Sequence, residues 1–188
     1  MRKPVWILWV CLATAGVVRA GEQPANKKQE HYSAVIVGTR GEVDALTKTV
    51  DMQIKEYTSQ AKVKELLGIL QKSGHQGLRK SLEKLDVGQV SATGSAGTPI
   101  SVARSRQTEK GTLISLVTPR NLSFSESRYA AGTKNYEFGI IQIVVDEKGN
   151  GEGTVYPAAR VKFDNDGFII IESYGHIDTL KLSNVRRY

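Results

Sequence analysis

Short segments in which apolar residues alternate with polar ones recur along most of this chain, and they constrain its fold more than any other feature. In residues 49–55, Val50, Met52 and Ile54 alternate with polar side chains, as expected for a strand with one buried face. Similar segments and short β-branched runs predict nine strands, near residues 33–38, 49–55, 87–93, 99–107, 111–118, 135–146, 152–163, 167–174 and 178–186.

Residues 59–86 change to the period of a helix. A first apolar stripe has the spacing i, i+3, i+4 and i+7, and it consists of Val63, Leu66, Leu67 and Leu70. Ser59 is its candidate N-cap, and Ser73 with Gly74 is its candidate stop. A second, shorter stripe follows at Leu78, Leu82 and Leu85, with Arg79 and Glu83 paired at i, i+4 beside it. The pattern predicts a helical pair packed on the sheet.

The connections between the predicted strands favour an antiparallel arrangement. Residues 148–151 and 165–167 contain Gly and Asn, which tolerate the positive φ of hairpin turns. Strands do not alternate with helices, and no Gly-rich loop leads from a strand into a helix, which argues against a nucleotide-type parallel sheet. The predicted fold class is α+β, mainly antiparallel β, sandwich or barrel-like, with the helical pair inserted.

The first 20 residues have the pattern of a secretory signal peptide. Arg2 and Lys3 precede an apolar run over residues 5–18, and Val18 and Ala20 occupy the cleavage subsites. Cleavage after Ala20 would leave a polar, flexible leader at residues 21–31 and a single β-rich domain at residues 32–188. The mature protein would then be periplasmic or extracellular.

Charge and cysteine content exclude several classes of function. The chain has 188 residues with 26 Lys or Arg and 19 Asp or Glu, a net charge of +7. Loss of three basic residues with the signal peptide lowers this to +4, too mild to indicate a nucleic-acid partner. No later apolar run reaches the roughly 18–20 residues of a membrane-spanning helix. Cys11 follows the bulky Trp9 and Val10, which favours an ordinary residue of the signal peptide over a lipid attachment site.

Candidate catalytic and metal-binding residues are scattered. The spacing of His31, His75 and His176 does not suit a metal site, so neither a metal nor another cofactor is expected. Residues 146–153 resemble a calcium loop, but Lys148 stands where an oxygen ligand is needed, so we expect a β-turn. The chain has no Gly-x-Ser-x-Gly elbow. Carboxylates that would suit glycoside hydrolysis are Glu126, Glu137 and Glu172.

Residues 122–134 show no regular period and predict a long surface loop, a kind of segment that often carries function. Glu126, Arg128 and Tyr129 are the candidate binding residues in it. The leading hypothesis is an exported, non-enzymatic binding or structural module of the bacterial cell envelope, with an envelope component or small ligand as partner. The alternative is a small secreted hydrolase that uses carboxylate or Ser groups near this loop.

Several motifs resemble an uncharacterised family of exported bacterial proteins of the acidobacterial type. The resemblance covers most of the mature chain and implies no activity or catalytic residue. It depends on residues 38–41, 50–55, 136–138, 146–153, 173–175 and 182–186.

The signal-peptide hypothesis predicts the N-terminus of the exported protein. Mass spectrometry of that protein should give a chain that begins at Gly21 and carries no lipid. A chain that begins at an acylated Cys11 would contradict both the cleavage site and the expected release from the membrane.

Overall fold

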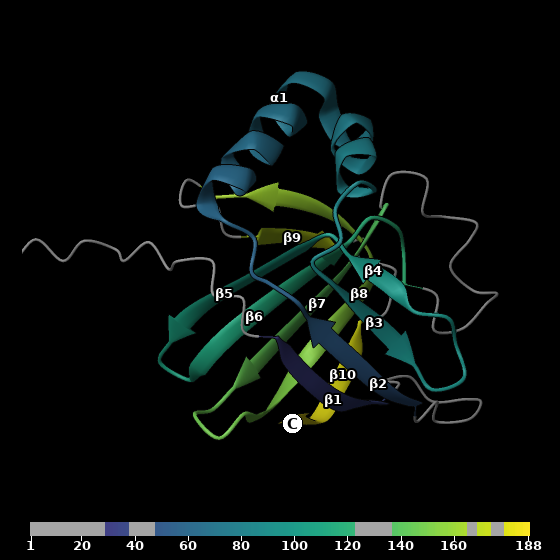
Figure 1. Cartoon of the computed structure of the whole chain (residues 1–188), viewed down its shortest axis with the longest axis vertical. Coiled ribbons are helices and arrows are strands. Elements are labelled where there is room, and N and C mark those ends of the chain that lie inside the picture. The colour runs from purple at the N-terminus through teal and green to yellow at the C-terminus, as the bar shows by residue number, and fades with distance from the viewer. Residues whose placement is uncertain (1–28, 38–47, 123–136, 165–168, 174–178) are drawn as a thin grey trace, which may run out of the picture.

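An antiparallel sheet of ten strands and one helical element make up the described part of the chain (Figure 1). The structure is a computed structural model that describes residues 29–37, 48–122, 137–164, 169–173 and 179–188. The helical element is α1 (Gln60–Leu82). The strands are β1 (Glu30–Val37), β2 (Lys48–Ile54), β3 (Gly88–Ala92), β4 (Thr98–Ile100), β5 (Val102–Thr108), β6 (Gly111–Thr118), β7 (Phe138–Val145), β8 (Asn150–Phe163), β9 (Ile169–Ser173) and β10 (Leu180–Arg187).

The sheet curls into a nearly closed barrel. Its strand order is β4-β3-β2-β1-β10-β8-β7-β6-β5, and β9 pairs with β8 beside this path. The two edge strands, β4 and β5, are consecutive in the sequence and separated by one residue, Ser101. The predicted antiparallel β architecture is confirmed, and of the two predicted forms, sandwich and barrel-like, the sheet has the barrel-like one. The prediction of one strand at residues 99–107 is wrong, because the chain turns at Ser101 from one edge of the sheet to the other.

Hydrogen bonds from Ser101 hold this corner. Its backbone N–H donates to the Val117 carbonyl of β6 (2.8 Å), and its hydroxyl donates to the Leu82 carbonyl at the end of α1 (2.7 Å). The residue is fully buried. Thr58, just before α1, pairs with Ala103 of β5: its N–H donates to the Ala103 carbonyl (2.8 Å), and its Oγ1 accepts the Ala103 N–H (3.1 Å). Around the corner, the chain itself therefore supplies hydrogen-bond partners for backbone groups at the start of β5.

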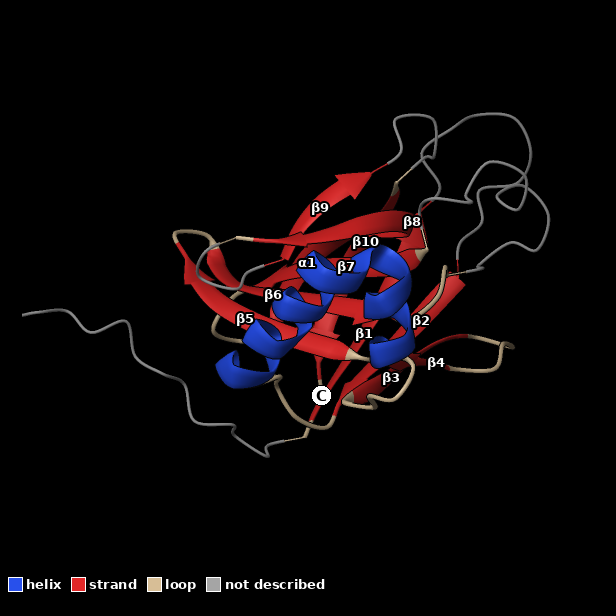
Figure 2. Ribbon diagram, turned by 90° about the horizontal axis from the view of Figure 1, so that it is seen from above, coloured by secondary structure: helices blue, strands red, loops and turns tan. Residues whose placement is uncertain are grey.

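The two faces of the sheet bury different apolar clusters. Leu116 belongs to the cluster inside the barrel, whereas its neighbour Val117 belongs to the cluster under α1, as the alternation of side chains along a strand requires. Val50, Met52 and Ile54 are buried inside the barrel, as predicted. Figure 2 shows α1 lying over the other face of the sheet. Its side chains pack there on Val102, Val117, Phe138, Ile140, Ala159, Val161 and Ile169.

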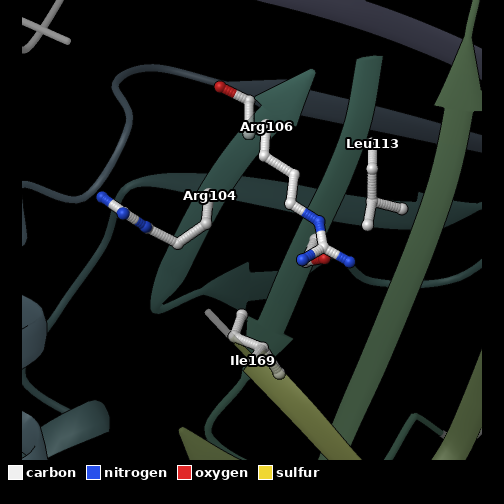
Figure 3. A pocket seen from close by; sticks show the side chains of 6 residues that line it. Arg104, Arg106, Leu113 and Ile169 are labelled. Atoms are coloured by element: carbon white, nitrogen blue, oxygen red, sulfur yellow. The ribbon is translucent and has the colours of Figure 1, made fainter. Parts of the chain in front are cut away.

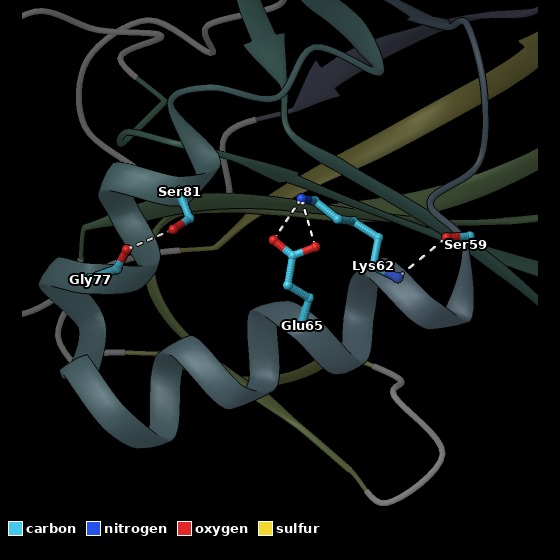
Figure 4. Close-up of polar contacts among 5 residues, drawn as sticks. All are labelled: Ser59, Lys62, Glu65, Gly77 and Ser81. Carbon is cyan, nitrogen blue, oxygen red and sulfur yellow. Dashed lines mark hydrogen bonds and ion pairs between the residues drawn. The ribbon is translucent and has the colours of Figure 1, made fainter.

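The helical segment begins where the sequence predicts. The Ser59 side chain accepts the N–H of Lys62 (3.3 Å), which confirms the N-cap (Figure 4). One turn on, the Lys62 ammonium binds both carboxylate oxygens of Glu65 at 2.9 Å. Leu66, Leu78 and Leu82 are buried against the sheet.

The prediction of two separate helices is wrong. Residues 60–82 form one helical element with a kink at Gly74, where φ is 63° and ψ is −164°. Glycine adopts this backbone conformation without steric cost, so the chain changes direction there within one residue instead of through a loop. The helix ends at Leu82, and Leu85 packs against the cluster under α1 from beyond that end.

Other boundaries differ slightly from the predicted ones. β1 begins at Glu30, so the last two residues of the predicted leader belong to a strand. Leu122, placed in the predicted surface loop, is instead buried in the core. The turn before β8 is confirmed: Gly149 has φ 81°, and the Asp146 carboxylate accepts the N–H of Asn150 (2.8 Å). The predicted turn at residues 165–167 lies outside the described residues.

Within the described residues, no helix combines the length and apolar character needed to cross a membrane.

The buried corner generates a stability prediction. Substituting Ser101→Ala removes the hydroxyl that donates to the Leu82 carbonyl, which keeps its hydrogen bond from the Leu85 N–H (3.0 Å), so the free energy of unfolding should fall by about 1 kcal/mol. The control is Thr108→Val, which removes an exposed hydroxyl that donates to the Gly111 carbonyl (2.6 Å). Water replaces that bond, so a change within about 0.5 kcal/mol is expected. Urea unfolding measures both, and equal losses would contradict the role of the corner.

Candidate functional site

A small hollow lies on the α1 side of the sheet, where β5, β6 and β9 meet (Figure 3). Its volume is about 10 Å³, the space of about one water molecule. The residues that line it are two arginines, two serines and two apolar residues: Arg104, Ser105, Arg106, Leu113, Ser115 and Ile169. The hollow can therefore admit one small polar group rather than a whole ligand.

Arg104 joins this hollow to the start of the helix. Its Nη1 donates to the Thr58 carbonyl (2.9 Å), and its Nη2 donates to Oε1 of Gln60 (2.7 Å). Burial lowers the pKa of the guanidinium, while the nearby Asp164 carboxylate acts in the opposite direction. Arginine remains charged despite such a shift. Arg104 thus places a fixed, partly buried positive charge beside the hollow.

Arg106 reaches over the hollow from the same strand. In Figure 3 its side chain extends across the neighbouring strand towards Leu113, whereas Arg104 points to the opposite side. The two arginines are two residues apart on β5, and they pair in register with Ser115 and Leu113 of β6. A guanidinium and hydroxyls are hydrogen-bond donors that suit a carboxylate or phosphate oxygen. The geometry therefore favours an anionic group.

The hydrogen bond that Ser115 makes suits a binding residue rather than a nucleophile. It is 6% exposed, and its Oγ accepts a hydrogen bond from Nε2 of Gln142 on β7 (3.3 Å). A catalytic serine needs a base that accepts its proton, but the side chains that line this hollow include neither a His nor a carboxylate. The described lining can therefore bind and orient a group, and no described lining residue provides a base for Ser115.

A second polar cluster stabilises the start of β1. One carboxylate oxygen of Glu30, Oε2, accepts hydrogen bonds from the hydroxyls of Tyr57 (2.6 Å) and Tyr32 (2.9 Å). Burial raises the pKa of both phenols, and the Glu30 carboxylate raises it further. Both phenols consequently stay protonated as donors, and the hydrogen bond from Tyr57 connects β1 to the segment that leads into α1.

The binding residues predicted from the sequence, Glu126, Arg128 and Tyr129, lie outside the described residues, so they stay a prediction. At the described ends of that segment, Asn121 Oδ1 and Glu137 Oε2 are buried without a hydrogen-bond partner. Glu172 instead forms an exposed ion pair with Lys162 (2.8 Å). The hydrolase alternative, which places its groups near this loop, also stays a prediction.

The histidines lie apart where they are described. The His31 ring stacks at a tilt on Tyr188, with ring centroids 5.7 Å apart, and the His75 ring lies 6.2 Å from that of Phe138. His176 lies outside the described residues. In the described part of the chain, no three His, Cys, Asp or Glu side chains come together as a metal site would need.

Sequence reasoning missed the hollow. Arg104 and Arg106 alternate within the strand predicted at residues 99–107, which indicates that they share a face. That pattern could not show that Ile169, more than 60 residues away in the chain, would complete the lining.

Comparisons of this chain with protein-family models, curated proteins and solved structures give no match.

The tyrosine cluster predicts a loss of stability in alkali. Because the folded-state pKa of Tyr32 and Tyr57 lies above the ordinary value of about 10, the folded protein binds these protons more tightly than the unfolded chain does. Their stabilising contribution is complete below about pH 10 and is lost as the pH rises further. The free energy of unfolding should fall above that pH, and less steeply in the double variant Tyr32→Phe and Tyr57→Phe.

Urea unfolding at a series of alkaline pH values measures this dependence. Tyr188→Phe is the control, since Tyr188 is 71% exposed, and it should retain the wild-type slope. Equal slopes in the double variant and the wild type would show that the two phenols do not cause the dependence.

Proposed function

We propose that this protein is an exported, non-enzymatic binding module of the bacterial cell envelope, which holds an anionic group of its partner at the hollow beside Arg106. The observation that carries the proposal is the Arg106 side chain, which lies over a water-sized hollow that Ser115 also lines (Figure 3). Export is supported by the signal-peptide pattern of residues 1–20.

The packing of the barrel favours the outer surface as the place of binding. Small barrels either fill their interior with side chains or enclose a ligand. Here apolar residues from nine of the ten strands and from Leu122 fill the interior, and most of them are under 5% exposed. A partner would therefore meet side chains on the outside of the sheet, where the hollow opens.

The character of the hollow favours an anion over a neutral ligand. Hydrogen bonds in which a guanidinium donates to a carboxylate or phosphate are about twice as strong as neutral ones. Leu113 and Ile169 lie beside these donors and lower the exposure of a bound group to water. One oxygen of a carboxylate or phosphate matches the volume of about 10 Å³.

A titration followed by NMR tests the site. Acetate and inorganic phosphate are the probes, and amide signals of β5 and β6 near the hollow should shift as either is added. In Arg106→Gln the affinity should fall by about tenfold, as expected when a charged hydrogen bond is lost. The control is Lys110→Gln, which removes the same charge from an exposed position just after β5 and should bind as the wild type does.

The same titration separates the hollow from the loop predicted by the sequence. The double variant Arg128→Ala and Tyr129→Ala should retain the wild-type affinity for both probes if the hollow binds the anion. Loss of binding in that variant, with Arg106→Gln unaffected, would place the site on the loop and overturn the proposal.

A further inference from the structure

The positive charge of this protein is concentrated in the helical segment. Residues 60–84 contain six Lys or Arg and two Glu, a net charge of +4, within a chain whose total is +7. The basic residues are Lys62, Lys64, Lys72, Arg79, Lys80 and Lys84. A segment of 25 residues, α1 and the turn after it, therefore carries more than half of the net charge.

The two acidic residues of the segment are already paired with its own cations. Glu65 binds the Lys62 ammonium at 2.9 Å, and Glu83 binds Nε of Arg79 at 3.1 Å. Four lysines remain, at positions 64, 72, 80 and 84, and all four are exposed. None of them takes part in the ion pairs that join described residues. The solvent face of α1 and its C-terminal turn thus present uncompensated positive charge.

The placement of α1 makes this charge accessible to a large partner. The helix lies across one end of the molecule, and in the view from above it lies nearest to the viewer over the sheet (Figures 1 and 2). Of its apolar side chains, Leu66, Leu70, Leu78 and Leu82 pack in the cluster on the sheet. The large apolar side chains exposed in the described residues, Val37, Ile170 and Tyr188, are not on this helix. The helix therefore presents exposed positive charge without an exposed large apolar side chain.

We infer that this basic surface of α1 and of the turn after it (Lys64, Lys72, Lys80 and Lys84) docks the protein onto the surface of a bilayer that contains anionic lipids. Lysine is a compact, strongly hydrated charge that attracts anions without the planar pairing of arginine, which suits a diffuse layer of headgroups. Lys64 and Lys72 lie before the kink at Gly74, whereas Lys80 and Lys84 lie after it. The charges are therefore spread along the helical segment, which fits a broad surface better than a single polymer strand. The docking is independent of the hollow beside Arg106.

The size of the effect follows from the number of lysines. Each Lys near an anionic bilayer contributes about 1 kcal/mol, which corresponds to about fivefold in binding. Replacing three of them by Gln, in the variant Lys64→Gln, Lys72→Gln and Lys80→Gln, should therefore weaken binding to anionic vesicles on the order of 100-fold. Gln and Lys have similar helix propensities, so α1 should remain folded, and circular dichroism checks this.

Co-sedimentation with lipid vesicles tests the inference on the purified chain without its signal peptide. The vesicles are phosphatidylcholine alone, or phosphatidylcholine with about 30 mol % phosphatidylglycerol. The wild type should sediment with the anionic vesicles at low salt and remain in solution with the neutral ones. It should dissociate from the anionic vesicles in about 0.5 M NaCl, because salt at that concentration screens charges over a few ångströms. The matched control is Lys110→Gln, Lys148→Gln and Arg186→Gln, three exposed cations on strands and turns.

The control variant removes the same net charge, so it separates a specific face from the total charge of the protein. Retained binding by the control and loss by the α1 variant would support the inference. Equal losses in both variants would overturn it, as would equal sedimentation with neutral vesicles. Binding of the wild type to soluble alginate or DNA, without binding to anionic vesicles, would overturn it in favour of a polymer partner. Arg106→Gln should bind vesicles as the wild type does, so this result and the anion titration can fail separately.

Discussion

The buried hydroxyl of Ser101 donates to the carbonyl of Leu82, while the amide of the same residue donates to Val117. These two bonds join the corner between the edge strands to the end of α1 and to β6. A sheet of ten strands with free edges would expose unpaired backbone groups, which promote association with other chains. Turning the chain at one residue brings both edges together and lets Thr58 complete β5. The position of α1 and the curvature of the sheet both depend on this closure.

Closure also decides where the protein can interact. The side chains on the inner face of the sheet pack against one another in the interior of the barrel. Part of the outer face is covered by Leu66, Leu78 and Leu82 of α1. The hollow beside Arg106 lies on the outer face, next to the cluster that the helix covers, since it shares Ile169 with that cluster. The helix therefore has two roles: its apolar side stabilises the sheet, and its lysine side is left for an anionic surface.

Two networks of polar groups fix the helix at its beginning. Tyr57, in the segment before α1, donates to Glu30 at the start of β1, and Arg104 of β5 donates to Thr58 and Gln60. Buried or half-buried charges are costly unless they are hydrogen-bonded, and each of these charges has at least two such bonds. They orient the segment between β2 and α1 more specifically than apolar contacts alone would.

Local features were predictable from the sequence because they depend on residues within a few positions of each other. The alternation of Val50, Met52 and Ile54 predicted a strand with one buried face, Ser59 predicted the start of the helix, and Gly149 predicted a tight turn. Gly74 predicted an interruption of the helix, although not that the two parts would form one kinked element. The predicted binding residues Glu126, Arg128 and Tyr129 lie outside the described residues, so that prediction is still open.

The order of the strands, the closure at Ser101, the pairing of Tyr57 with Glu30 and the hollow were decided by the tertiary structure. A spacing of two residues shows which side chains share a face, but it does not show which strand lies beside which. β1 and β10 pair although they are almost 150 residues apart, as the contact between Val35 and Ser183 illustrates. The charge of α1 could be counted in the sequence, but its exposure on one end of the molecule depends on how its apolar side packs. These contacts form because distant segments bury apolar surface against each other. That burial depends on the whole folded chain, so no single segment of the sequence reveals it.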